Sequence, residues 1–439
     1  MVNIKEHSSQ KLDIQILILD EYKRFFSFAV LKIALSFKVD NGCQVNLTEG
    51  AAILPTEAKK KKRYLYEVDL MRCIFIFGVL INHVSSLFTN AVSKSSGAYE
   101  FFTATHLMPH FTRMGFMFVT GLVLFLGNYK KDHLDVVPFW IKRFKGSGIP
   151  YVFWNGFYIL ITLLVMGSFT FPEWLGEWGD ALLHGNRFYL YYILVTMQLY
   201  LIFPIMLWLY KRFVNRHNLI ISISALIQLL FLFYIKYIFP HQDHTNWPYL
   251  FRSYGMFVLT YQFYFMAGAY VSIHYDKVTT LLMTYQKRIY AITACLSLGT
   301  IGLYYYNTKF LGLSRHYAHL VHQPYMMIYA IFMIATIFAL SLHYAKNREK
   351  PSLQWLRRSV DLSSKLSFGI YLTQTASLAI FGLVIDWINP YLSDVALALL
   401  FPLGYLLVLG GAWLISYFCY KVSPFGILIG RPNHIKKGN

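Results

Sequence analysis

The chain of 439 residues has few charged residues. Asp, Glu, Lys and Arg make up 14% of it, whereas they make up about a quarter of a typical soluble domain. Hydrophobic residues make up 56% and occur in long runs rather than in short periodic stretches. These features exclude an ordinary soluble globular protein. We therefore expect an all-α, polytopic membrane protein.

Cysteine is also scarce, and the four residues are scattered without a CxxC or Cys/His spacing. This pattern gives no support to a disulfide framework or a zinc site, and we expect no bound metal. The chain lacks a P-loop and a GxGxxG sequence. No early apolar stretch ends in the small residues typical of a cleavable signal peptide, so we expect none.

Acidic residues number 21 against 40 Lys and Arg, which gives a formal net charge of +19. Such an excess could indicate nucleic-acid binding. The basic residues, however, fall between hydrophobic runs and do not form one patch. Their distribution is typical of membrane topology, and we expect a lipid bilayer, not nucleic acid, as the partner.

The hydrophobic runs predict ten membrane-spanning helices. Between them, 26 Lys and Arg residues fall on one side and six on the other. Because positive loops stay on the cytoplasmic side, this ratio places both termini in the cytoplasm. The predicted spans are residues 65–88, 113–128, 149–167, 188–210, 218–239, 254–273, 289–306, 324–344, 366–385 and 394–420.

Three regions follow from this pattern. Residues 1–63 form a cytoplasmic N-terminal extension. Its apolar stretch 12–39 is interrupted by Asp20, Glu21, Lys23 and Arg24, which fits an interfacial or disordered segment better than a span. Residues 64–420 form the membrane domain. Residues 421–439 form a basic cytoplasmic tail.

The first span carries two ionisable residues in helical register. Arg72 and His83 are eleven residues apart, and at ~100° per residue eleven steps return to within about 20° of the starting direction. They therefore share a face, separated by roughly 16 Å along the helix. Asp69 lies on that face one turn before Arg72. Ionisable residues inside a membrane are costly, so we take His83, Arg72 and Asp69 as candidate catalytic residues.

Structural interpretations of these residues stay open beside the functional one. His83 could be a buried histidine that is hydrogen-bonded to Asn82, to a tyrosine or to a backbone carbonyl. Arg72 could be a snorkelling anchor paired with Asp69. A neutral imidazole in a low-dielectric cavity would nevertheless be a competent general base.

A second candidate precedes the third span. Arg143 and Lys145 stand two residues apart, before the sequence Gly146-Ser147-Gly148-Ile149-Pro150. Two basic residues before a glycine-rich turn would suit the phosphate groups of a donor, although ordinary positive-inside flanking explains them too.

Several stretches together resemble the membrane acyltransferase family 3, the multispanning O-acyltransferases that modify cell-surface glycans. The resemblance runs from about residue 64 to 420. It includes the Arg-x10-His pair Arg72/His83 and Arg143-Phe144-Lys145, which is similar to the family's Arg-x-Arg. The stretch Arg113 to Gly121 is similar to its Phe-Phe-x-x-Ser-Gly, with Thr120 for Ser. Where many members have a histidine in the ninth span, this chain has Gln374.

The resemblance implies an O-acyltransferase that takes an acyl group from cytosolic acyl-CoA, the co-substrate, with no bound cofactor. His83 would be the catalytic base or the acyl carrier, and Arg72 its essential partner. Arg143 and Lys145 would contact the CoA phosphates. The acceptor would be a glycan hydroxyl at the outer face, which implies a bacterial cell membrane.

Residues 192–198 and 263–270 look most like the poly-N-acetylglucosamine adhesin branch, whose members are O-succinyl- or O-acyltransferases of biofilm exopolysaccharide. That branch would add a polysaccharide synthase machinery as a partner, with acetyl-CoA or succinyl-CoA as the donor. The main alternative is a polysaccharide or organic-anion transporter, in which His83 and Arg72 would line a substrate path. A membrane protein with no chemistry is the third hypothesis.

The count of basic residues predicts the result of a topology experiment. A reporter fused after residue 170 should lie outside the cytoplasm, and one fused after residue 215 should lie inside, because positive loops are retained there. Alkaline phosphatase and green fluorescent protein fusions measure the two locations. The reverse assignment would contradict the cytosolic donor site.

Overall fold

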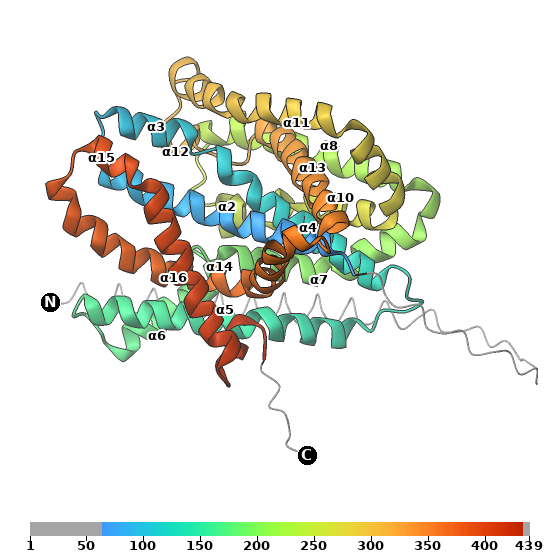
Figure 1. Cartoon of the computed structure of the whole chain (residues 1–439), viewed down its shortest axis with the longest axis horizontal. Coiled ribbons are helices and arrows are strands. Elements are labelled where there is room, and N and C mark those ends of the chain that lie inside the picture. Colours follow the sequence, from blue (N-terminus) through green and yellow to red (C-terminus); the bar gives the residue numbers. More distant parts are fainter. Residues whose placement is uncertain (1–63, 433–439) are drawn as a thin grey trace, which may run out of the picture. The chain divides into compact units, whose positions relative to one another are not determined.

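The structure, a computed structural model, describes residues 64–432 (Figure 1), so the predicted extension 1–63 lies outside the described residues. Within that range the chain is helical and contains no strand. The α-helices are α2 (Tyr66–Ala91), α3 (Gly97–Thr105), α4 (Phe111–Asn128), α5 (Val136–Val165), α6 (Phe171–His184), α7 (Tyr191–Arg212), α8 (His217–Phe233), α9 (Tyr249–Arg252), α10 (Gln262–Ile273), α11 (Tyr275–Tyr305), α12 (Arg315–Ala318), α13 (Pro324–Asn347), α14 (Gln354–Ile388), α15 (Asp394–Leu399) and α16 (Phe401–Lys421).

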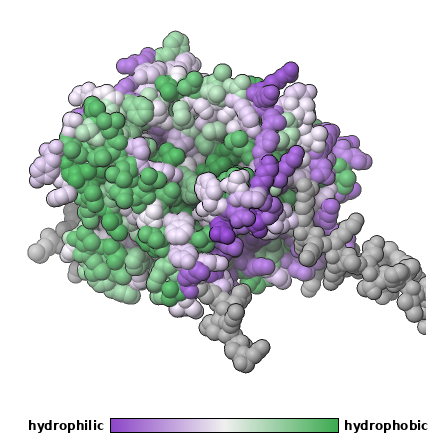
Figure 2. Space-filling view, in the orientation of Figure 1, coloured by the Kyte–Doolittle hydropathy of each residue, from purple (hydrophilic) through white to green (hydrophobic). Residues whose placement is uncertain are grey.

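The predicted all-α polytopic fold is confirmed. In the described range, nine helical segments are long and apolar enough to cross a membrane. Large apolar side chains on α8, α14 and α16 are exposed, and Figure 2 shows apolar surface over much of the visible face. Trp387 and Leu383 of α14, for example, are each 72% exposed. An apolar surface of this extent is stable only against lipid or another protein.

The sixth predicted span, residues 254–273, differs from the prediction of one long helix. Its only α-helix, α10, has 12 residues, or about 18 Å, which is too short for a ~30 Å hydrocarbon layer. Two short 3₁₀ turns, Tyr254–Met256 and Val258–Thr260, precede it. His274, just after α10, lies 3.0 Å from His217 at the start of α8, measured between ring nitrogens. The chain therefore returns to the level at which α8 began, by an irregular path.

Glutamine side chains from neighbouring helices satisfy this irregular backbone. Gln198 of α7 donates to the Met256 carbonyl at 2.8 Å and accepts from the Val258 amide at 3.1 Å. Gln228 of α8 donates to the Thr260 carbonyl at 2.9 Å. Non-helical backbone at membrane depth needs such partners because lipid offers none. These glutamines are therefore structural.

Contacts among the connecting segments sort them into two groups. The segments before α2, between α7 and α8, and between α10 and α11 lie on one side. Hydrogen bonds from Tyr275 to Glu67 and from Lys211 to the Lys131 carbonyl join parts of this group. This basic side carries the loops with most of the Lys and Arg residues. On the opposite side, Asn389 donates to the Ala91 carbonyl at 3.1 Å. That the basic side faces the cytoplasm stays a prediction.

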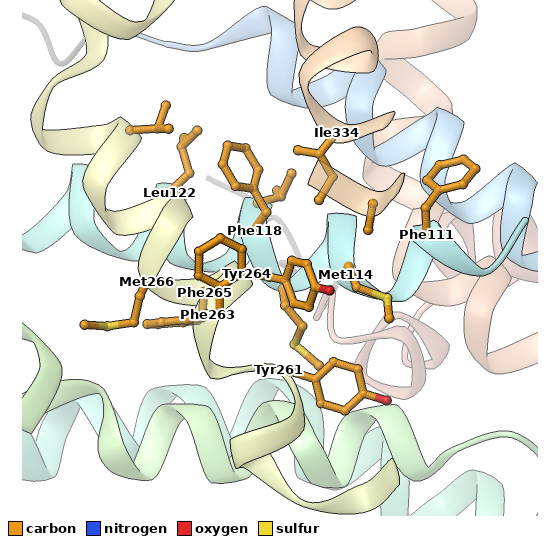
Figure 3. Close-up of a cluster of buried hydrophobic side chains, with 14 of the residues drawn as sticks. Phe111, Met114, Phe118, Leu122, Tyr261, Phe263, Tyr264, Phe265, Met266 and Ile334 are labelled. Carbon is orange, nitrogen blue, oxygen red and sulfur yellow. The ribbon is translucent and has the colours of Figure 1, made fainter. Parts of the chain in front are cut away.

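The most extensive helix packing within the described residues joins α4 and α10, shown in Figure 3. The two backbones touch where each helix has a glycine, Gly121 on α4 and Gly268 on α10. A Cβ atom at Gly121 would overlap the Phe265 carbonyl, and one at Gly268 would overlap the Phe118 carbonyl. Small residues permit this approach between membrane helices. The contact holds α4 in place at the centre of the bundle.

Helix α2 packs against α4, α13, α14 and α16. It lies in the interior of the bundle (Figure 1), and 16 of its 26 residues are buried. Most of α2 is therefore surrounded by protein rather than by lipid. That position allows its polar residues to line internal cavities.

The glycine contact predicts the behaviour of two substitutions. Gly268→Ala should destabilise the protein by about 1–3 kcal/mol, because a backbone carbonyl cannot move aside as a side chain can. Gly127→Ala is the matched control, since nothing lies within 4 Å of its added Cβ, and alanine is the better helix former. Thermal unfolding of the detergent-solubilised protein measures both. Equal melting temperatures for the two variants would contradict the close approach.

Candidate active site

A first internal cavity opens toward the basic side. Its volume is about 440 Å³, and its walls come from α2, α4, α5, α7, α14 and the segment after α16. Within the described part of the chain, its lining contains no Asp or Glu. Its basic residues are Arg72, Arg113, Lys142, Arg143, Lys365 and Arg431. A cavity with this many cations attracts a polyanionic ligand. We call it the basic-side cavity.

A second cavity of about 950 Å³ is lined largely by residues nearer the opposite side. We call it the opposite-side cavity. Imidazole and phenol side chains with two arginines provide most of its polar surface, and its described lining also contains no Asp or Glu. Histidines and tyrosines are suited to hydrogen-bond a polar, uncharged ligand. Its histidines are His106, His110, His244, His319 and His322.

The two cavities meet inside the bundle. His110, Arg113 and Tyr191 line both of them. His83 lines the basic-side cavity and is 8% exposed. Arg113 and His110 line the basic-side cavity together with His83, which brings the three groups to one space. We call this shared region the junction. A ligand from each side could meet there.

His110 is the most unusual polar residue at the junction. It is 3% exposed, and among the described residues neither of its ring nitrogens has a hydrogen-bond partner. An unpaired polar group that is buried this deeply is costly. The ring of His106 lies 4.8 Å away, centroid to centroid. His322 also lines the opposite-side cavity and lies in the segment before α13, outside the membrane-spanning helices. Burial together with the charge of Arg113 lowers the pKa of its imidazole to about 3.

The ring of Tyr189 covers His83, with the two ring centroids 3.9 Å apart. Phe188 and Tyr189 both have positive φ values, 55° and 61°, which are strained for bulky residues. Two α14 side chains hold this turn, since Tyr371 donates to the Tyr189 carbonyl and Thr375 donates to the Phe188 carbonyl at 3.0 Å. Strain of this kind persists only where the surroundings enforce it, and it is common at functional sites.

Three of the sequence-predicted residues lie as the helical register requires. Arg72 and His83 both line the basic-side cavity. Asp69 does not line it, but lies 3.9 Å from the Arg72 guanidinium and accepts a hydrogen bond from Tyr64 at 2.8 Å. It is 4% exposed. The predicted pairing of Asp69 with Arg72 is therefore present, and Asp69 supports Arg72 from behind.

The structure separates Arg143 from Lys145. The expected glycine-rich turn after them was wrong, because α5 continues through Gly146 and Pro150 to Val165. Residues two apart on a helix point in nearly opposite directions. Arg143 lines the cavity, with its guanidinium over the Tyr200 ring at 5.7 Å. Lys145 is exposed and does not line it.

Other cavity residues were not assigned by the sequence. Arg113 was one of the six basic residues of the opposite side and the first residue of a family-like stretch, with no catalytic or binding role assigned, and no motif marked His110. Lys365 and Arg431 were counted as loop and tail charges. The tail folds back after α16, where Trp154 of α5 donates to the Leu428 carbonyl at 2.8 Å. That contact brings Arg431 to the cavity. No local pattern in the sequence predicts this position of Arg431.

The junction combines groups suited to proton transfer with a group suited to charge stabilisation. In the described part of the chain, no group of three or more His, Cys, Asp or Glu residues could hold a metal ion. What the junction does offer is a buried imidazole, a guanidinium and several phenols. An imidazole can take and return a proton, and a guanidinium can stabilise a developing negative charge.

Residues 65–417 match a family model described as an acyltransferase domain. No curated protein and no solved structure matches the chain. The match covers most of the chain, including α2, α4, α5 and α14, which line the junction and the basic-side cavity. The chain therefore belongs to the membrane acyltransferase family 3 and is a multi-pass membrane acyltransferase.

Proposed function

We propose that this protein moves an acyl group from cytosolic acyl-CoA to a hydroxyl group of a cell-surface polysaccharide. The observation that carries the proposal is the meeting of two cavities, one opening to each side, at the junction next to His83. A donor and an acceptor on opposite sides of a membrane need such a meeting point.

The basic-side cavity suits the donor. Coenzyme A carries several phosphate groups, and guanidinium groups bind phosphates through paired hydrogen bonds. Arg72, Arg143 and Arg431 lie on its wall, and none of the described lining residues is a carboxylate. Arg72 and His83 are roughly 16 Å apart along α2. The extended pantetheine arm can reach from phosphates near Arg72 to a thioester near His83.

His83 is proposed as the general base. Its imidazole takes the proton of the acceptor hydroxyl as the hydroxyl oxygen attacks the thioester carbon. It then returns the proton to the departing CoA thiolate. Because both ligands can reach the junction, direct transfer needs no acyl-enzyme intermediate. Asp69 and Tyr189 position the machinery, Asp69 through Arg72 and Tyr189 through its ring contact with His83.

The opposite-side cavity suits a neutral glycan. Its histidines, tyrosines and Asn90 offer hydrogen bonds to sugar hydroxyl and amide groups. Poly-N-acetylglucosamine has this chemistry, and residues 192–198 and 263–270 resemble the branch that modifies it. We therefore propose poly-N-acetylglucosamine as the acceptor, acetyl- or succinyl-CoA as the donor, and the bacterial cell membrane as the location, beside the polysaccharide synthase.

The function is tested with His83→Gln in inverted membrane vesicles that receive labelled acyl-CoA from outside. Glutamine keeps much of the size and hydrogen bonding, so the protein should reach the membrane at normal levels. Transfer to the glycan should fall by about 10²–10⁴-fold, because general-base catalysis is worth that much.

His133→Gln is the matched control, since the His133 side chain is 83% exposed and lines neither cavity. It should transfer at the wild-type rate. Normal glycan acylation by His83→Gln would contradict the mechanism. Movement of glycan across the vesicle membrane without acylation would favour the transporter hypothesis.

The donor site is tested with Arg143→Ala and Lys145→Ala. The arginine variant should weaken acyl-CoA binding by about 1–3 kcal/mol, the value of a hydrogen bond to a charged group. The lysine variant should have a smaller effect, because Lys145 is exposed and outside the cavity. Equilibrium binding to the purified protein in lipid nanodiscs measures both. Equal losses would contradict the cavity as the donor site.

A further inference from the structure

Arg113 is a cation in the membrane interior that has no counter-ion among residues 64–432. Its side chain reaches the junction from the first turn of α4. Within the described residues it forms no ion pair, whereas Arg72 pairs with Asp69 and Arg348 with Asp361. An unpaired charge at membrane depth is costly and is retained where function needs it.

Tyrosines orient this guanidinium without neutralising it. Arg113 lies over the Tyr191 ring, 5.5 Å from the ring centroid. The phenols of Tyr261 and Tyr371 also interact with its charge. A neutral phenol can hold a guanidinium in one position, yet it leaves the positive charge available to a ligand.

His110 points to the same space independently. It lies three residues before Arg113 and also lines both cavities. Its two ring nitrogens are buried and, in the described part of the chain, have no hydrogen-bond partner. An unsatisfied imidazole beside an unpaired guanidinium indicates a ligand with oxygen atoms that carry negative charge at some stage.

We propose that Arg113 binds the oxyanion that forms on the thioester carbonyl oxygen during acyl transfer. This inference rests on the proposed function. As the acceptor oxygen bonds to the carbonyl carbon, the π electrons move onto the carbonyl oxygen, and the hydroxyl proton passes to His83. When the carbonyl re-forms, the carbon–sulfur bond breaks, and the CoA thiolate takes the proton back from His83. Arg113 faces the charge that exists only between these two events.

The proposal is tested with Arg113→Gln in the vesicle assay, with acetyl-CoA and succinyl-CoA as separate donors. Removing one oxyanion donor typically costs about 10²–10³ in kcat. We expect kcat to fall by this factor with both donors, while the KM for acyl-CoA stays nearly unchanged. Arg187→Gln is the control, because Arg187 is partly exposed, pairs with Glu177 at 3.4 Å and lines neither cavity.

A chemical rescue distinguishes the loss of the Arg113 charge from a structural defect of the variant. Added guanidinium ion should restore part of the rate of Arg113→Ala and leave His83→Gln inactive, because it replaces the missing charge but not the base. A Gln variant with normal kcat would overturn the proposal while leaving the acyltransferase function intact. A loss confined to succinyl-CoA would also overturn it, since the site would then bind the acyl carboxylate. Absence of transfer by the wild-type protein would overturn the proposed function itself.

Discussion

Hydrocarbon cannot form hydrogen bonds, so each polar group within the membrane needs a partner from the protein or a place in a cavity. Gln198 and Gln228 meet this requirement by holding the irregular segment before α10. Thr373 meets it by donating to carbonyls of α14 and α16. His83 and Arg113 instead line cavities. Among these residues, Gln198, Gln228 and Thr373 hold the helices together, whereas His83 and Arg113 are accessible to a ligand.

The site depends on how two helices are held. Helix α4 carries Arg113, and its close contact with α10 at Gly121 and Gly268 sets its depth in the bundle. Helix α14 holds the strained Tyr189 turn, which places a ring against His83. Each catalytic candidate thus rests on a contact far from it in the sequence. Substitutions at these supporting contacts should therefore impair the site without touching it.

Gln374 shows how family resemblance and structure complement each other. The resemblance leads to the expectation of a histidine there, whereas this chain has a glutamine that is fully buried and lines neither cavity. A second imidazole at that point of α14 is therefore absent from this chain. His110 lies in the short turn before α4, and His322 lies in the segment before α13. Both contribute an imidazole to the opposite-side cavity. The junction thus has more than one histidine without relying on residue 374.

The sequence by itself determined the helical membrane fold, the alternation of basic loops and the shared face of Arg72 and His83. Each of these follows from local chemistry: the cost of charge in lipid and the period of the helix. The register also indicates that Arg143 and Lys145 point apart, once α5 is known to be continuous. Because a turn was expected after these two residues, the sequence did not predict that their side chains point apart.

Only the tertiary structure decided the broken return through α10, the junction and the placement of Arg113 and Arg431. Their positions depend on contacts between segments distant in the chain, such as Trp154 with Leu428. A sequence pattern reports how a residue faces along its own helix. It does not report which other helix that face contacts, because this contact is determined by the close packing of side chains from many segments.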